Sequence, residues 1–576
     1  MAKTLWVTTR FKENIDIRTK LIGALEAITP DHLKHCKPYT HQEGNTTLGI
    51  LNPSGLRHLQ GTNHILGDIF EKRENWFVPN TGTPEGAFSL FRENGEVVEI
   101  LSDSLASRTV WYYMDQRYFI ASSSQRAILL LLGGRQWNEQ VIPWMFSSGT
   151  LGPSNSWDTR LKSLDPDSTL SLDKSAWNLK VSKKAVHFDP QPLDEAGQVE
   201  RLRSSIREVL GPHYSMPSDW VLSISGGVDS RGLLYAVLAH APTSQEIKTL
   251  TWGGKATMKQ RESDFYLGQV LAKQANTSHS NVILDREQVP FELLWERFLT
   301  NGEGRVDNIT GYVDGFGLWE KLHRQGIKGM LRGDEAFGQL LGLQHRENPD
   351  FLRFTIGLSL CRDFQQPYFR LLSEAYTQEL PASYAKRGEE SWYTWRDRLY
   401  QEFRMPLVMA ALTDLKLAYL EVVNPFLSQS ILNAVRNIPD QGRLEKRAFA
   451  SLVNSFWPEV PYASSGSGIR PSELMQRKDA STKMMDLLQG SDAGVLFPQQ
   501  FREGLLKDIQ NRQGAKFKAK ALLKKLLPSP KRGRSVNLDR PMPVNCFQMG
   551  LRAMMILDMY QRLGDSPKRL VLPQGP

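Results

Sequence analysis

The chain has 576 residues, of which 40% are hydrophobic and 23% are charged, and its net charge is +9. This composition is typical of a globular protein, and the length is too great for one ordinary hydrophobic core, so we expect two or three domains. No run of eighteen apolar residues occurs, which predicts no membrane span. The start of the chain shows no signal-peptide core, the three cysteines show no CxxC spacing and the eleven histidines show no paired ligand spacing. We therefore expect a cytoplasmic protein without a disulfide framework or a local zinc motif.

Residues 1–190 contain short apolar stretches separated by turn residues, which is the pattern of a β-rich domain. The clearest strands are expected at 86–92, 97–101, 110–113 and 118–121, and a short helix is expected at 125–132. We expect these elements to form a layered α/β/β/α domain. The proline-bearing connection at 188–195 marks its end, so that a second domain covers residues 195–576.

The second domain begins with strands that alternate with helices. Strands are expected at 220–225, 247–252 and 281–284, and helices at 196–210, 231–241 and 262–274. Such alternation predicts parallel pairing, and hence a doubly wound α/β sheet. After about residue 345 the strand pattern disappears, and we expect an additional helical region from there to the end. The predicted fold class is therefore α/β.

The strongest functional signal is a glycine-rich turn between the first of these strands and its helix. It reads Ser225-Gly226-Gly227-Val228-Asp229-Ser230. Two glycines let the backbone approach an anion, and the amides at the start of a helix favour one. The two serine hydroxyls add donors, and Asp229 supplies an oxygen ligand for Mg²⁺. The spacing and the missing lysine exclude a Walker A loop. The turn instead resembles the PP-loop of ATP pyrophosphatases, which is a pyrophosphate cradle.

A second acidic pair, Asp334 and Glu335, follows a short apolar stretch. A carboxylate facing Asp229 could share one or two magnesium ions with it, so we predict Asp229 and Asp334 as metal ligands. The alternative is an ordinary helix start with acidic residues on its dipole.

A basic segment lies between residues 516 and 534. We interpret it as a solvated helix, with an acidic partner or a membrane surface as the alternative. No nucleic-acid motif accompanies it, and we expect no nucleic-acid partner.

Several motifs resemble those of the asparagine synthetase superfamily. The turn at 225–230 resembles its SGGxDS, Asp334 to Gly338 resembles its DEVFG, and Asn424 to Leu427 resembles its YPFLD. The resemblance implies an ATP-pyrophosphatase that uses ATP and Mg²⁺, with Asp229, Asp334 and Glu335 in catalysis. It further implies that ATP and pyrophosphate are bound by the turn at 225–230 and by Thr251, Trp252 and Gly253, which resemble the loop that contacts adenine.

The departures from this family are informative. Its glutamine-using members need a cysteine at the processed N-terminus, whereas Met1 is followed here by Ala2 and the first cysteine is Cys36. The first domain is therefore expected to be an inactive glutaminase-like (Ntn-type) domain. The lysine expected after the YPFLD helix is also missing from the stretch 461–470, where Arg470 is the basic residue.

Arg231 directly after the turn, together with Ser148-Gly-Thr-Leu-Gly-Pro153, resembles the macrolactam synthetases of lasso-peptide biosynthesis (lasso cyclases). The resemblance implies a ligase that adenylates a side-chain carboxylate of a precursor peptide and closes a ring with the peptide's N-terminal amine. A leader-processing cysteine protease and a leader-binding protein are the partners that it implies. Glu335, Glu262 and His279 are candidates for the general base.

Two alternatives stay open at this stage. One is an asparagine synthetase-like or β-lactam synthetase-like ligase that acts on a small molecule with free ammonia or another amine. The other is a nucleotide-binding scaffold without catalysis.

Overall fold

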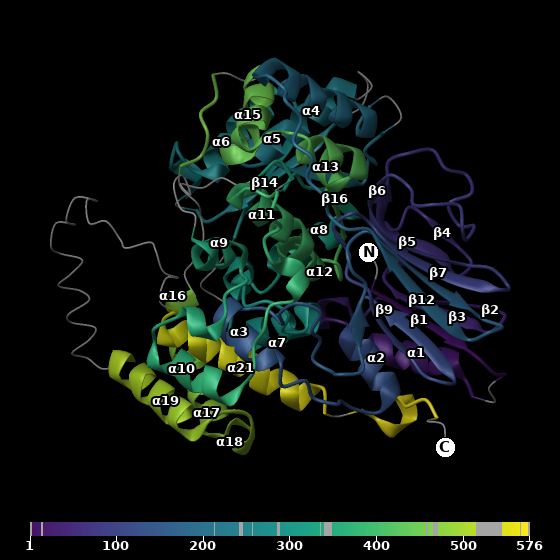
Figure 1. Ribbon diagram of the computed structural model, residues 1–576, viewed down its shortest axis with the longest axis vertical. Helices are drawn as coiled ribbons and strands as arrows, with labels where there is room; N and C mark the ends of the chain where they lie inside the picture. The colour runs from purple at the N-terminus through teal and green to yellow at the C-terminus, as the bar shows by residue number, and fades with distance from the viewer. Residues whose placement is uncertain are drawn as a thin grey trace.

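The computed structural model describes residues 3–573 except for 13–14, 212–213, 241–245, 256, 285–288, 335, 339–347, 457–458, 465–470, 514–543 and 565. The expectations for Met1, Ala2, Glu335, Arg470 and the basic segment therefore lie outside the described residues. The fold is mixed α/β, with two antiparallel sheets and one parallel sheet (Figure 1). Within the described part of the chain, no helix is long and apolar enough to cross a membrane.

The first half of the chain forms two six-stranded antiparallel sheets. The first sheet has the order β10-β8-β9-β1-β3-β2, and the second has the order β12-β11-β7-β6-β5-β4. The strands of the first sheet are β1 (Lys3–Thr9), β2 (Tyr39–Glu43), β3 (Thr46–Leu51), β8 (Trp111–Met114), β9 (Tyr118–Ser122) and β10 (Lys162–Ser163). Those of the second are β4 (Leu59–Gln60), β5 (Asn63–Ile69), β6 (Gly86–Glu93), β7 (Val97–Ser102), β11 (Ser168–Asp173) and β12 (Asn178–Lys183).

These sheets stack face to face because their strands are apolar on both sides. On β6, Phe91 points into the core between the two sheets, whereas Phe88 and Leu90 belong to a separate cluster on the other side. Helices α1 (Ile17–Ala27) and α2 (Gln125–Leu132) pack on the outer face of the first sheet. A loop containing Trp76 and Phe77 packs on the outer face of the second. Three of the four expected layers are therefore present, and a loop covers this outer face where a helical layer was expected.

The parallel sheet lies in the second half and has the order β15-β14-β13-β16-β17. Its strands are β13 (Trp220–Ser223), β14 (Lys248–Gly253), β15 (Ser278–Ile283), β16 (Gly329–Leu331) and β17 (Glu421–Val423). Helices α4 (Glu195–Val209), α5 (Val228–His240) and α6 (Asp264–Gln274) share one apolar cluster with it, and α7 (Phe291–Gly302) and α8 (Gly317–Arg324) share another. Apolar contacts on both faces identify the sheet as doubly wound. Its strand order reverses between β13 and β16, where such sheets form a crevice for ligands.

Helix α3 (Val141–Ser148) lies between β9 and β10, and the α-helices not yet named among the described residues follow β16. They are α9 (Pro349–Ile356), α10 (Pro367–Ala375), α11 (Trp392–Leu399), α12 (Ala410–Asp414), α13 (Gln429–Arg436), α14 (Asp440–Arg443), α15 (Arg447–Asn454), α16 (Pro471–Met475), α17 (Lys478–Gln489), α18 (Ser491–Leu496), α19 (Gln499–Gln513) and α21 (Cys546–Arg562). Strand β17 contradicts the expectation that strands end near residue 345. Its Glu421 looks unsuited to a buried strand, but Arg108 pairs with its carboxylate at 2.7 Å.

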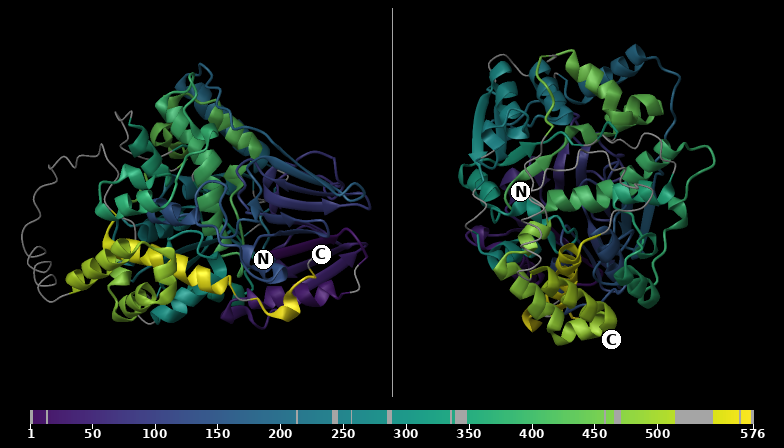
Figure 2. Two further views of the ribbon diagram at one scale, coloured as in Figure 1. Left: turned by 60° about the horizontal axis from the view of Figure 1, so that its bottom comes forward. Right: turned by 90° about the vertical axis from the view of Figure 1, so that its left-hand side faces the viewer.

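The two halves of the chain share one apolar cluster. It runs from α1 and α2 through α7 and α8 to α21, which is buried along most of its length. Figure 2 shows α21 in yellow, with the chain after it returning to the first half. There the amide of Leu572 donates to the carbonyl of Leu131 at 2.8 Å. The division into domains at residues 190–195 stays a prediction.

Candidate functional site

The glycine-rich turn lies at the carboxyl end of β13, directly before α5. Strand β13 ends at Ser223, and α5 begins at Val228, which is buried. The first-turn amides of a helix point along its axis towards the preceding turn, and together with the helix dipole they favour an anion there. The helix starts three residues earlier than the sequence pattern predicted, which places Asp229 and Ser230 in its first turn.

Side chains accept hydrogen bonds from the three amides that precede the helix. The amide of Ser225 donates to the Ser230 hydroxyl at 3.0 Å, and the amide of Gly227 donates to the Ser225 hydroxyl at 3.2 Å. The amide of Gly226 donates to the Asp264 carboxylate at 3.1 Å. Burial raises the pKa of Asp264, although this hydrogen bond acts in the opposite direction.

The turn needs glycine at position 226 because another segment packs against it. A Cβ atom on Gly226 would lie 2.6 Å from the Cβ atom of Ala463. The amide of Ala463 donates to the carbonyl of Gly226 at 3.1 Å. The segment around Ala463 thus forms one wall of the turn.

Arg231 fastens this wall to α5. Its side chain is fully buried, and it donates to the carbonyls of Val460 and Pro461 at 2.6 and 2.9 Å. The guanidinium also lies over the Tyr462 ring, 4.3 Å from its centre. The arginine that follows the turn therefore has a positioning role in this structure.

The second acidic segment meets the turn at the switch point of the sheet. A Cβ atom on Gly333 would lie 2.6 Å from the carbonyl oxygen of Asp229, so the chain after β16 touches the first turn of α5. The next residue, Asp334, forms an ion pair with Arg332 at 3.1 Å. Its carbonyl accepts a hydrogen bond from the Asn424 side chain at 2.8 Å. Asp229 and Asp334 thus lie on segments that meet at the same edge of the sheet, and their role as ligands of one metal centre stays a prediction.

Lys446 is a residue of the site that the sequence analysis missed. Its ammonium group forms an ion pair with the Asp229 carboxylate, and its side chain is 5% exposed. We expected no lysine after the helix that follows the Asn424–Leu427 motif, but Lys446 occupies that place, directly before α15. The turn that delivers it has left-handed backbone at both Glu445 and Lys446, which no short motif predicts. The signal available in the sequence was the lysine itself, between that motif and the stretch 461–470.

A cleft of about 180 Å³ lies between the glycine-rich turn and the segment at 332–334, and neither Asp229 nor Lys446 is among its lining residues. Its walls include Ser225, Ser230, Asp264, Arg332 and Asp334, together with Thr251 and Trp252 at the end of β14. The hydroxyl of Thr251 donates to the carbonyl of Ile224 at 2.8 Å, which ties β14 to the turn. Gly253 packs against Phe265 of α6. The cleft is smaller than the roughly 300–1,000 Å³ of typical ligand pockets, so it encloses only part of a nucleotide.

Of the candidates for a general base, His279 and Glu262 lie in the described part of the chain, and they differ in their position relative to the cleft. Burial lowers the pKa of His279, and its ring nitrogens lie 2.9 Å from the Thr249 hydroxyl and 3.1 Å from the Asn281 side chain. His279 pairs in register with Thr249, below the strand end that carries the cleft. Glu262 is exposed and accepts a hydrogen bond from Ser464 at 3.0 Å, beside the wall of the turn. Of the two, only Glu262 lies near the cleft.

The donor set fits a magnesium nucleotide. Two carboxylates are suited to the cation, while serine hydroxyls and helix amides are suited to the phosphates. Lys446 and Arg332 form ion pairs with these two carboxylates, so two cationic side chains also lie at this edge of the sheet.

Comparison with known proteins adds no relative to this picture. No protein-family model matches the chain, and no curated protein matches it.

Proposed function

We propose that the chain is an ATP-dependent, AMP-forming carbon–nitrogen ligase. One observation carries this proposal: the turn at 225–230 and the segment at 332–334 meet at the switch point of a parallel sheet, with Lys446 on Asp229 and Arg332 on Asp334. A phosphate cradle, two carboxylates and two cations at one sheet edge suit the transfer of an adenylyl group and the departure of pyrophosphate.

The residues have distinct roles in this proposal. Ser225, Ser230 and the first amides of α5 hold the terminal phosphates. Asp229 and Asp334 would hold Mg²⁺, which offsets the negative charge of the phosphates. Lys446 and Arg332 exchange their carboxylate partners for phosphate oxygens as the substrate carboxylate attacks the α-phosphorus. Thr251 and Trp252 line the side of the cleft where adenine is expected.

The proposed substrate is a precursor peptide. Its side-chain carboxylate forms the adenylate with release of pyrophosphate, and its own N-terminal amine then displaces AMP to close a macrolactam. Holding both ends of one chain makes the second step effectively unimolecular, which contributes up to roughly 7–11 kcal/mol in well-oriented cases. The resemblance of 225–231 to the lasso cyclases supports this choice, and a leader-processing cysteine protease and a leader-binding protein would supply the substrate.

The test supplies ATP and a linear core peptide encoded beside this gene. A product lighter by one water, together with AMP and pyrophosphate, is expected. Asp229→Asn and Lys446→Met should each lower pyrophosphate release by about 10²–10³-fold, as the removal of one preorganised charge does. Lys483→Met is the matched control, because Lys483 forms a surface ion pair with Glu292 at 3.1 Å.

Other products would point elsewhere. A product that gains the mass of an added amine identifies an intermolecular ligase, and ATP binding without pyrophosphate release identifies a scaffold. Release of ADP, or full activity of Asp229→Asn, would refute the proposed chemistry.

A further inference from the structure

A cluster of metal-binding side chains lies away from the cleft. One ring nitrogen each of His35 and His323 and the sulfur of Cys36 all lie within 4.8 Å of one another. His35 and Cys36 follow the 3₁₀ turn at Asp31–Leu33, whereas His323 is on α8. We propose that these three residues form a Zn²⁺ site that links the first half of the chain to α8.

The tautomer of His323 suits metal binding. Its Nδ1 atom lies 3.0 Å from the carbonyl oxygen of Tyr419, and a carbonyl only accepts, so Nδ1 carries the proton. The lone pair is therefore on Nε2, which faces the Cys36 sulfur at 3.9 Å. A backbone carbonyl behind a histidine ligand is a common way in which proteins orient the ring and raise its basicity.

The segment that carries His35 and Cys36 is anchored beside α8. Asp31 binds the Arg297 guanidinium through both carboxylate oxygens, the shorter distance being 2.7 Å. His32 lies 3.3 Å from the Glu320 carboxylate. His32 thus faces Glu320, and His35 faces His323. His32 and His35 are three positions apart along the chain, and so are Glu320 and His323. This register holds the ligands together before any metal arrives.

The donor set selects the kind of metal. Two imidazoles and a thiolate favour Zn²⁺ over Mg²⁺ or Ca²⁺, which prefer oxygen. Tetrahedral bonds of about 2.3 Å to sulfur and about 2.0 Å to nitrogen place these two atoms roughly 3.5 Å apart, so a shift of a few tenths of an ångström brings Cys36 and His323 to this spacing. The ring nitrogen of His35, which lies within 4.8 Å of both, would move closer as the metal binds. Water takes the fourth position. Burial raises the pKa of the Cys36 thiol, whose proton passes to solvent when the sulfur binds the metal.

This site is chemically distinct from the carboxylate pair at the cleft, and it does not depend on the proposed function. The test uses the purified full-length protein, stripped with a chelator and titrated with Zn²⁺ or Co²⁺. One equivalent should bind, and Co²⁺ should give a thiolate-to-metal charge-transfer band together with the visible bands of a tetrahedral complex.

Three variants test the three ligands. Cys36→Ser should abolish the charge-transfer band, and His323→Gln and His35→Ala should each weaken Zn²⁺ binding by at least about tenfold. His35 is exposed, so its replacement leaves the fold intact. Cys546→Ser and His187→Gln are the matched controls and should bind as the parent protein does. A Co²⁺ complex without the thiolate band, or equal Zn²⁺ affinity in the ligand variants and the controls, would overturn the proposal.

Discussion

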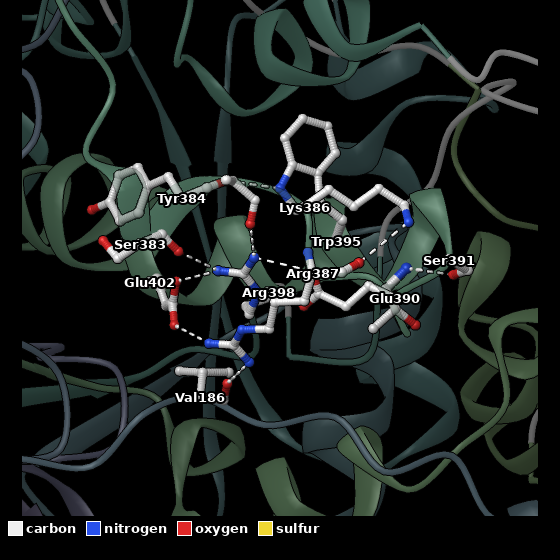
Figure 3. A network of polar contacts seen from close by, with 12 residues as sticks. Val186, Ser383, Tyr384, Lys386, Arg387, Glu390, Ser391, Trp395, Arg398 and Glu402 are labelled. Carbon is white, nitrogen blue, oxygen red and sulfur yellow. Dashed lines mark hydrogen bonds and ion pairs between the residues drawn. The ribbon is translucent and has the colours of Figure 1, made fainter.

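Replacing Arg398 with methionine should destabilise the protein in a way that depends on pH. The guanidinium is fully buried and donates to the carboxylates of Glu390 and Glu402, the latter at 2.9 Å. It also donates to the carbonyls of Ser383 and Ala385 at 3.0 and 2.7 Å. Figure 3 shows this network, in which Arg387 reaches the carbonyl of Val186 at 3.1 Å and so joins it to the chain leaving the first half.

The expected loss follows from the charges that the substitution leaves behind. Methionine fills much of the space but leaves the buried Glu390 and the largely buried Glu402 without their main partner. Breaking a buried pair in this way costs about 3–5 kcal/mol. Burial raises the pKa of Glu402, and Arg398 offsets part of this rise. Burial alone would also raise the pKa of Glu390, but hydrogen bonds with Arg398 and the Arg387 amide lower it instead.

The pH dependence has a definite sign. Without Arg398, both folded-state pKa values should lie above the unfolded value of about 4.3. A raised pKa on an acid means that the folded protein binds more protons, so the variant loses stability as pH rises through the folded-state values. The deficit relative to the parent protein should therefore be largest near neutral pH and smaller near pH 5.

Urea unfolding at pH 5 and at pH 7.5 measures both effects. Arg203→Met is the control, because Arg203 pairs with Glu200 on the surface at 2.8 Å, and its loss should stay within about 0.5 kcal/mol. A deficit below about 1 kcal/mol for Arg398→Met, or one that is the same at both pH values, would refute the reasoning.

Two further predictions concern the walls of the cleft. Gly333→Ala places a methyl group 2.6 Å from the Asp229 carbonyl oxygen, so it should cost about 1–3 kcal/mol in urea unfolding and slow pyrophosphate release; an unchanged rate would contradict the close contact. Arg231→Lys cannot reproduce the fork that reaches the carbonyls of Val460 and Pro461. It should lower stability by about 1–3 kcal/mol and speed hydrogen exchange around Ala463, and unaltered exchange there would argue against its positioning role.

The parts of the fold that depend on local pattern were predicted well. The helices now labelled α2, α4 and α6 lie within a few residues of their expected positions, because apolar spacing and capping residues act over short distances. The strand before the glycine-rich turn was visible for the same reason, as was the turn itself. The three strands expected at 220–225, 247–252 and 281–284 correspond to β13, β14 and β15, which pair in parallel as predicted.

The parts that were missed depend on partners far away in the chain. Glu421 can occupy a buried strand only because Arg108 neutralises it, and these residues are 313 positions apart. Lys446 reaches Asp229 across 217 positions and through a left-handed turn. Cys36 and His323 are separated by 287 positions, so no spacing rule along the chain would pair them.

The return of the chain to its first helices has a consequence for biosynthesis. The methyl groups of Leu570 sit where a side chain on Gly23 would be, and those of Val571 lie against Gly133. The apolar surface around Gly23 and Gly133 is synthesised early in translation, whereas the residues that pack on it are made some 440 residues after Leu131. At about 5–20 residues per second, this is a delay of roughly 20–90 s. During that interval the apolar surface around Gly23 and Gly133 would be exposed to solvent on the nascent chain. A chaperone that binds apolar segments would cover it until Leu570 and Val571 are made.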